Sequence, residues 1–229
     1  MGSKTAELQA QGKRVLFAFE EAIGFMCGTA VLDKDGISAG IRVAEMAAFL
    51  GSNGMSLRDK LDELFKEYGY HISNNSYFLC YEQPVIKRLF ERLRTFSRQP
   101  NTYPESLLNG KYEVMFVRDL TSGYDSSQPD QQAILPVSRS SQMITFTFKN
   151  GLVATLRTSG TEPKIKYYAE LCAPPTETLT LLEDFTVLGV TFSNYRNLEV
   201  VQETLKEMVT AIISEFLQPD LNGLKARNA

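Results

Sequence analysis

The chain has 229 residues, and its 24 basic and 27 acidic side chains give a formal net charge of −3. A hydrophobic fraction of 43% with 22% charged residues is ordinary for a folded globular protein of one or two domains. This balance lacks the basic footprint that nucleic acids or anionic membranes require. We therefore expect no nucleic acid and no membrane as partner, and we expect local basic clusters to serve a local anion.

Three cysteines and one histidine, His71, limit the redox and metal chemistry that the sequence predicts. The cysteines are Cys27, Cys80 and Cys172, and they form no C-x-x-C pair, so neither a zinc site nor a disulfide framework is expected. This pattern suits a reducing, cytoplasmic location. A mechanism with two imidazoles is excluded, and His71 is expected to be structural. No signal segment and no run long enough to span a bilayer is found.

The first 70 residues are typical of part of a parallel α/β domain. Residues 15–19 are continuously apolar, as expected of a strand buried on both faces, and two acids follow at the strand edge where open α/β sheets bind ligands. Residues 41–50 predict an Ala-rich buried helix, and residues 57–68 predict an amphipathic one. Because one strand cannot make a sheet, we expect the chain to be a fragment of a longer protein.

From about residue 72 the patterns predict the order β-α-β-β-β-β-α, after a polar turn at residues 74–76. The expected strands span residues 77–81, 112–117, 143–148, 152–156 and 165–171, and the expected helices span residues 83–96 and 199–217. This order predicts an antiparallel sheet with helices on one face. The predicted fold class is therefore α/β plus α+β, with a partial α/β/α domain first.

A short turn at residues 157–164, which read Arg-Thr-Ser-Gly-Thr-Glu-Pro-Lys, carries the strongest chemical signal. Gly160 allows a positive φ and a close backbone approach. Ser159 and Thr161 offer hydroxyl and N–H donors, and consecutive N–H groups can hold an anion. No nucleotide P-loop pattern is present. Taken alone, the turn fits an ordinary hairpin equally well.

The charges around two loops favour a phosphosugar as ligand. Arg157 supplies a planar fork that matches a phosphate, and Lys164 and Lys166 add point charges. Glu20 and Glu21 offer carboxylate oxygens, each of which accepts several hydrogen bonds from sugar hydroxyls. Together these groups suit a phosphosugar better than a nucleotide or a peptide.

The two loops, in this order, resemble those of the α-D-phosphohexomutase family. Residues 19–24, Phe-Glu-Glu-Ala-Ile-Gly, match the sugar-contacting loop of its third domain, with Ala in place of the usual Ser. Residues 157–161 match the Arg-x-Ser-Gly/Asn-Thr loop of its fourth domain. The turn at residues 33–36 resembles the segment that places a substrate-binding lysine, here Lys34. The resemblance covers the chain except about residues 175–198, which replace a short connector.

Longer motifs are similar to the phosphoglucomutase-2 branch, which contains phosphopentomutases and glucose-1,6-bisphosphate synthases. Residues 80–84, 123–129 and 217–224 look closer to the synthases. The resemblance implies that residues 1–71 are the later part of domain three. It implies that residues 72–229 are a TBP-like domain four with an atypical segment.

The resemblance also implies roles for individual residues. The expected sugar-binding residues are Glu20, Glu21, Gly24 and Lys34. The expected phosphate-binding residues are Arg157, Ser159, Gly160, Thr161, Lys164 and Lys166. The family's phosphoserine and its Mg²⁺-binding Asp-Gly-Asp-x-Asp loop belong to earlier domains, and neither motif occurs in this sequence. We therefore assign no catalytic or metal-binding residue here, expect Mg²⁺ to bind outside the chain, and expect the chain alone to be inactive.

These expectations leave several functions open. The first is part of an enzyme that transfers a phosphoryl group to or between hexose phosphates, in the manner of a glucose-1,6-bisphosphate synthase. A phosphopentomutase or phosphoglucomutase of the same branch is an alternative. A non-catalytic phosphosugar-binding or dimerisation module is another. The sequence indicates neither the oligomeric state nor the preferred sugar and phosphoryl donor.

Overall fold

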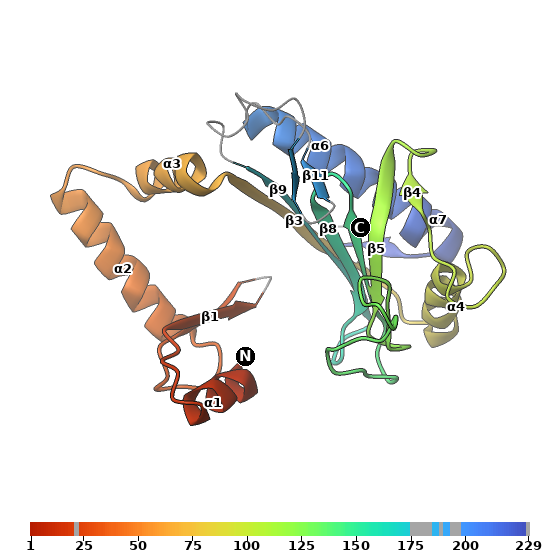
Figure 1. Cartoon of the computed structure of the whole chain (residues 1–229), viewed down its shortest axis with the longest axis horizontal. Coiled ribbons are helices and arrows are strands. Elements are labelled where there is room, and N and C mark those ends of the chain that lie inside the picture. The colour runs from red at the N-terminus through yellow and green to blue at the C-terminus, as the bar shows by residue number, and fades with distance from the viewer. Residues whose placement is uncertain (21–22, 175–184, 188–189, 193–197, 228–229) are drawn as a thin grey trace. The chain divides into compact units, whose positions relative to one another are not determined.

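A computed structural model describes residues 1–20, 23–174, 185–187, 190–192 and 198–227. The chain divides into two compact units, Met1–Leu64 and Phe65–Ala229 (Figure 1). This division by compactness does not test the family boundary expected between residues 71 and 72, which stays a prediction. Within the described residues, no helix is both long and apolar enough to cross a membrane.

Unit 1 combines helices with one two-stranded ribbon. Its elements are α1 (Gly2–Ala10), β1 (Phe17–Glu20), β2 (Gly24–Cys27), α2 (Gly36–Ser52) and α3 (Leu57–Tyr68), which continues into unit 2. β1 and β2 pair as an antiparallel hairpin. Asp35 caps α2, because its carboxylate accepts hydrogen bonds from the N–H groups of Ile37 and Ser38 at 3.0 and 3.2 Å. The ribbon thus positions Glu20, the last residue of β1, and the cap fixes the turn before α2.

The burial predicted for unit 1 is wrong in this structure. Phe17 and Phe19 of β1 are 53% and 70% exposed, and Phe49 of the Ala-rich helix α2 is 69% exposed. Apolar runs predict burial only where other elements cover them. Among the described residues of unit 1, the only strands are the two of the ribbon, so no sheet covers these side chains.

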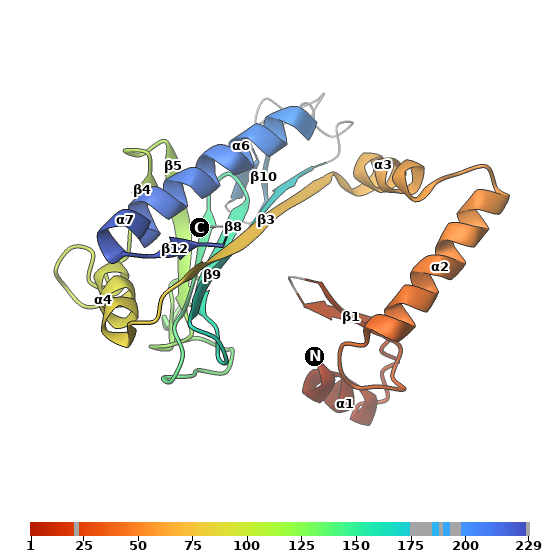
Figure 2. The same ribbon diagram turned by 180° about the vertical axis from the view of Figure 1, so that it is seen from behind.

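Unit 2 is built on an eight-stranded antiparallel sheet in the order β12-β3-β9-β8-β7-β5-β4, with β6 paired to β5 (Figure 2). Its strands are β3 (Tyr70–Leu79), β4 (Ser106–Leu107), β5 (Tyr112–Asp119), β6 (Tyr124–Asp125), β7 (Met143–Phe148), β8 (Leu152–Thr158), β9 (Lys164–Ala173) and β12 (Lys225–Ala226). Its helices are α4 (Gln83–Arg94), α6 (Leu198–Ala211), the π-helical segment η1 (Ile212–Leu217) and α7 (Pro219–Asn222). The principal elements follow the predicted order.

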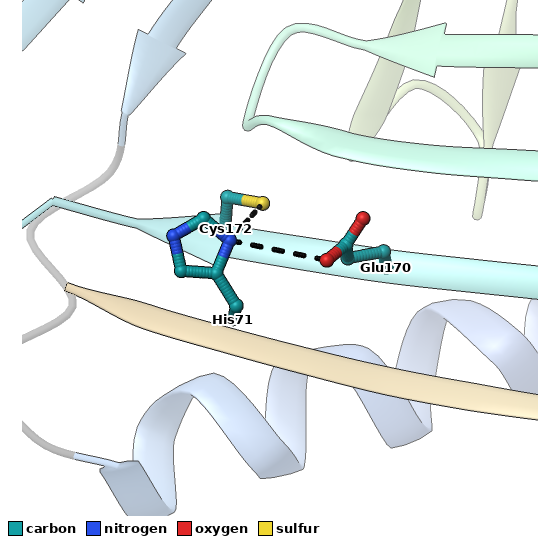
Figure 3. A group of neighbouring side chains, drawn as sticks. All are labelled: His71, Glu170 and Cys172. Carbon is teal, nitrogen blue, oxygen red and sulfur yellow. Dashed lines mark hydrogen bonds and ion pairs between the residues drawn. The ribbon is translucent and has the colours of Figure 1, made fainter. Parts of the chain in front are cut away.

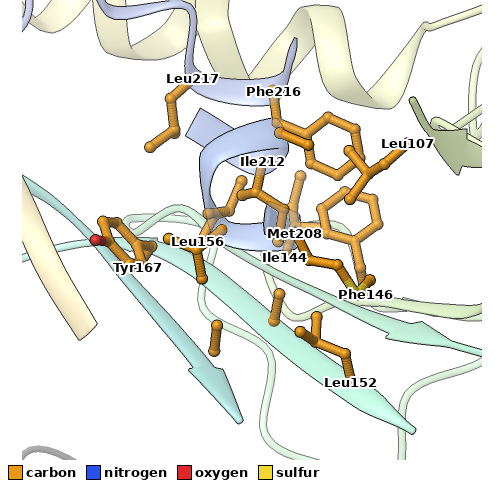
Figure 4. Packing of buried hydrophobic residues seen from close by; sticks show 14 of the residues in the cluster. Leu107, Ile144, Phe146, Leu152, Leu156, Tyr167, Met208, Ile212, Phe216 and Leu217 are labelled. Carbon is orange, nitrogen blue, oxygen red and sulfur yellow. The ribbon is translucent and has the colours of Figure 1, made fainter. Parts of the chain in front are cut away.

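One hydrophobic core lies between the sheet and its helices. Side chains alternate along β9, where Ile165, Ala169 and Leu171 are buried while their neighbours remain partly exposed. The helices α4, α6 and η1 contribute to the same buried cluster (Figure 4). The rings of Phe146 and Phe216 pack with centroids 4.8 Å apart. The helices therefore cover one face of the sheet, as predicted.

Two local predictions differ from the structure, at residues 74–76 and at the end of the last helix. Residues 74–76 were expected to form a turn but lie in β3, paired with β9, where the Tyr167 hydroxyl donates to Asn74 Oδ1 at 3.1 Å. Cross-strand pairing over ten residues outweighs the turn preference of Asn and Ser. The last helix changes to η1 after Ala211. The atypical segment contains β10 (Phe185–Val187) and β11 (Val190–Phe192), which pair antiparallel, and its other residues up to 197 lie outside the described ones.

A buried ion pair ties α4 to β5. Arg94 Nε lies 2.5 Å from Asp119 Oδ2, and the hydroxyl of Tyr103 donates to the same oxygen at 3.1 Å. Asp119 is fully buried, and its other oxygen accepts the N–H of Thr121 at 2.8 Å. Burial opposes ionisation, but the bonds and charge of Arg94 together with the backbone donors outweigh it and lower the pKa of Asp119.

We expect Asp119→Asn to destabilise unit 2 by about 3 kcal/mol or more, because it leaves the Arg94 charge without its buried partner. Urea unfolding monitored by circular dichroism measures the loss. The control is Glu113→Gln, which breaks the exposed pair with Lys149 and should cost about 1 kcal/mol or less. Equal losses for the two variants would contradict the anchoring role.

The same carboxylate makes stability depend on acid. Since the folded pKa of Asp119 lies below its ordinary value, its contribution is complete above about pH 4 and disappears as the pH falls through the folded pKa. In Asp119→Asn this part of the acid-induced loss should be absent.

Candidate anion-binding site

The loop between β8 and β9 is anchored by backbone hydrogen bonds. The N–H of Ser159 donates to the carbonyl of Lys164 at 2.9 Å, and the N–H of Lys164 donates to that of Glu162 at 2.7 Å. The carbonyl of Pro163 accepts the N–H of Cys80 at 2.9 Å, which joins the loop to the end of β3. The loop is therefore fixed both to its own strands and to the end of β3.

The conformation of Gly160 differs from the expectation. It is not among the glycines with positive φ, and a Cβ added to it would meet nothing within 4 Å. Gly160 therefore does not use the positive φ that a glycine allows. The open space beside Gly160 leaves its backbone accessible to a ligand, and this close approach is the other property expected of a glycine here.

A pocket of about 680 Å³ lies beside this loop. It is formed by the start of α4, the segment before β7, the end of β8 and the loop itself. The lining residues are Gln83, Pro84, Ile86, Lys87, Arg139, Ser140, Ser141, Gln142, Thr158, Ser159, Gly160, Glu162 and Lys164. Of the predicted phosphate-binding residues, Ser159, Gly160 and Lys164 line this pocket.

Lys164 is already paired with an acid from its own loop. Its ammonium lies 2.6 Å from Glu162 Oε1 and 4.2 Å from the centroid of the Tyr77 ring. The hydrogen bond to Glu162 raises the pKa of Lys164, and the same bond lowers the pKa of Glu162. An anion that binds Lys164 must therefore compete with an internal carboxylate.

The pocket contains cationic and polar groups that the sequence did not single out. Lys87 and Arg139 bring two further positive side chains. Gln83 begins α4, and a helix N-terminus favours a negative charge. Gln142 Oε1 is buried without a hydrogen-bond partner among the described residues, so it can accept a hydrogen bond from a ligand. In the sequence these residues belong to the first turns of a helix and to a polar segment before β7, and no motif there indicates a binding site.

Arg157 and Lys166 lie outside the pocket lining, as a cross-strand pair on β8 and β9. The guanidinium carbon of Arg157 is 5.6 Å from the centroid of the Tyr168 ring. Its Nε is buried and has no hydrogen-bond partner within the described part of the chain. Thr161 does not line the pocket either. The six predicted residues are thus near one another in the chain but divided between the pocket and its border.

In unit 1 the structure brings three of the four predicted sugar-binding residues together. Lys34 Nζ and Glu20 Oε1 form a short ion pair. A Cβ added to Gly24 would lie 2.6 Å from Glu20 Cγ and 3.0 Å from Lys34 Cδ. Only a glycine therefore leaves enough space for the ion pair at this position. Glu21 lies outside the described residues. The half-exposed pair offers acceptors and donors to hydroxyl groups.

Residues 3–68 match the family described as phosphoglucomutase/phosphomannomutase, alpha/beta/alpha domain III. A solved structure of pp63/parafusin, a phosphoglucomutase from Paramecium, resembles the chain with a TM-score of 0.52 at 14% identity. That alignment covers 94% of this chain and 33% of the solved one, and at this identity it supports the fold alone.

Curated relatives match nearly the whole chain. The chain is 54% identical to glucose 1,6-bisphosphate synthase from Homo sapiens, over 98% of this chain and 33% of the relative. It is 51% identical to phosphopentomutase from Homo sapiens, over 99% of this chain and 34% of the relative. A phosphoribomutase from Saccharomyces cerevisiae is 35% identical over 81% of this chain and 31% of the relative. The chain thus spans about a third of the length of these relatives, and it belongs to the phosphoglucomutase/phosphomannomutase family.

Proposed function

We propose that the chain supplies the sugar- and phosphate-binding loops of an enzyme that transfers a phosphoryl group to or between hexose phosphates. The observation that carries this proposal is the cationic pocket beside residues 159–164. Its combination with 54% identity to a glucose 1,6-bisphosphate synthase favours a synthase-like activity for the whole protein. The proposed ligand is a phosphosugar and the proposed location is the cytoplasm.

In this proposal unit 2 binds the phosphate that does not react. Ser159 presents its hydroxyl and Gly160 its backbone N–H, and the phosphate takes the place of Glu162 on Lys164. A phosphate dianion can displace a carboxylate because it carries more charge and more acceptor oxygens. Arg157 adjoins the lining residue Thr158 and has an unpaired donor, so we assign it to the same anion.

The remaining loop residues have supporting roles. Thr161 adds a hydroxyl and an N–H to the loop. Lys166 stands opposite Arg157, and its charge adds to the effect of Lys164 in lowering the pKa of Glu162. Binding of the distant phosphate would orient the reactive end of the sugar, since remote binding energy can be used for positioning.

Unit 1 is proposed to bind the sugar. Glu20 and Lys34 offer complementary partners for hydroxyl groups, and Gly24 keeps the space between them open. Glu21 is assigned the same role from the family resemblance. Because Ala22 removes a hydroxyl that the family usually has, we expect this loop to influence the choice of sugar.

The Mg²⁺ of the family does not fit the described residues. The group of three metal-ligating side chains that they contain includes a histidine and a cysteine, whereas Mg²⁺ prefers an all-oxygen set. We therefore propose that Mg²⁺ binds another part of the whole protein.

A phosphopentomutase activity is the second candidate function for the whole protein. It is favoured by the 51% identity to the human phosphopentomutase.

Arg157→Ala is expected to weaken glucose 1-phosphate binding by about one to two decades. A charged hydrogen bond contributes about 1.5–3 kcal/mol, which corresponds to that factor. Isothermal titration of the chain measures it. The matched control is Arg88→Ala, which removes the same charge from an exposed position of α4 outside the pocket lining. Identical affinities for Arg157→Ala and Arg88→Ala would remove the role assigned to Arg157.

Glu162→Gln is expected to strengthen the binding of inorganic phosphate by about threefold, because the ion pair between Lys164 and Glu162 no longer has to be broken. Phosphate titration followed by NMR measures the change. Glu113→Gln serves as the control for the net charge, since its exposed pair with Lys149 is remote from the pocket lining. Weaker binding in Glu162→Gln would mean that Glu162 helps to hold the anion.

The chain by itself is expected to bind phosphosugars without turning them over, because the sequence lacks the phosphoserine and metal-binding motifs of the family. Incubation with glucose 1-phosphate, a bisphosphorylated phosphoryl donor and Mg²⁺, followed by phosphorus NMR, tests this. Formation of a new phosphosugar by the purified chain would show that the expectation is wrong.

A further inference from the structure

Three side chains with metal-binding atoms meet where β3 begins and β9 ends (Figure 3). His71 stands directly opposite Cys172 in the antiparallel register. Glu170 lies two residues before Cys172, and alternate residues of a strand share one face. The residue between them, Leu171, is buried in the core. All three side chains therefore lie on the sheet face opposite the core.

The distances suit one small cation. His71 Nδ1 lies 3.2 Å from Cys172 Sγ and 3.9 Å from Glu170 Oε1. The three ligand atoms all lie within 4.8 Å of one another. A tetrahedral zinc ion with bonds of about 2.0–2.3 Å separates its ligands by roughly 3.3–3.8 Å. Small side-chain rotations would bring the atoms to these separations.

Two simpler interpretations explain the cluster less well. A reactive Cys–His pair would use only the thiol of Cys172 and the imidazole of His71, and it leaves the nearby carboxylate of Glu170 without a role. An ion pair between His71 and Glu170 would be about half exposed and therefore weak. Neither gives a reason for sulfur, nitrogen and oxygen ligands to converge, whereas this set is one that zinc binds.

We propose that His71, Glu170 and Cys172 bind one Zn²⁺ ion, with water at the fourth position. On binding, the thiol of Cys172 releases its proton to solvent as the metal–sulfur bond forms, and no electron is transferred. The ion joins the first residues of β3 to the last residues of β9. Lys164, at the opposite end of β9, lies roughly 27 Å away at the usual rise of a strand, so this site is separate from the phosphate pocket.

The test uses the full chain without a polyhistidine tag and Co²⁺ as a spectroscopic probe for Zn²⁺. Stoichiometric Co²⁺ should give the intense visible bands of a tetrahedral ion and a sulfur-to-cobalt charge-transfer band in the ultraviolet. Zn²⁺ should abolish both by displacement. Absence of these bands at stoichiometric Co²⁺ would overturn the proposal.

Variants identify the ligands. Cys172→Ser should lose the charge-transfer band, and Cys172→Ser and His71→Gln should each bind Co²⁺ roughly a hundredfold more weakly. The matched control is Cys27→Ser, which removes another free, partly buried thiol and should keep the band and the affinity. Unchanged binding in Cys172→Ser, or loss of the band in Cys27→Ser, would refute the site.

A stability measurement separates binding from misfolding. Zn²⁺ should raise the Tm of the original chain, because an ion that binds the folded state stabilises it. The same Zn²⁺ should raise the Tm of His71→Gln much less, and circular dichroism should show that this exposed substitution keeps the fold. An equal rise in Tm for both proteins would place the zinc elsewhere and contradict the proposal.

Discussion

The buried pair of Arg94 and Asp119 is the constraint on which the arrangement of unit 2 depends. The pair holds the end of α4 against β5. Asp119 is also the last residue of β5, so the long segment that leads to β7 begins directly after it. Asp119 accepts the N–H of Thr121, and the hydroxyl of Thr121 donates to the carbonyl of Ser141 at 2.9 Å. Ser141 lines the pocket. One buried carboxylate thus positions both the helix and the segment that form two of the pocket walls.

The sequence predicted the sheet of unit 2 where the signal was local. β7 and β8 alternate in polarity around a tight Asn-Gly turn, and a hairpin needs nothing else to define its register. Residues 74–76 were predicted incorrectly because their strand state depends on pairing with β9, more than ninety residues away in the chain. The burial of β1 was wrong for the related reason that an apolar run does not say what covers it.

The candidate sites show the same limit. Ser159, Gly160 and Lys164 were found because they are contiguous in a motif, but Lys87 and Arg139 reach the same pocket only through the fold. The proposed zinc site depends even more on the fold. The sequence predicted no zinc because no C-x-x-C pair exists, yet His71 and Cys172 become neighbours across two strands although 101 residues separate them. Spacing rules detect ligands within one turn and miss those that strand pairing brings together.

The strand β9 connects these features physically. Its buried alternate residues fix it to the core, while its partly exposed residues carry Lys164 at one end and Cys172 at the other. Since a one-residue slip would exchange these faces, the core that holds β9 also fixes which charges reach the pocket.

The Glu162–Lys164 pair limits which anions can bind at this loop, because a ligand must compete with the carboxylate of Glu162 for Lys164. A monoanionic carboxylate gains little by replacing Glu162, whereas a phosphate dianion brings extra charge and a third acceptor oxygen. In the proposed function, the loop's own acid therefore contributes to selectivity for phosphate over carboxylate as much as its bases do.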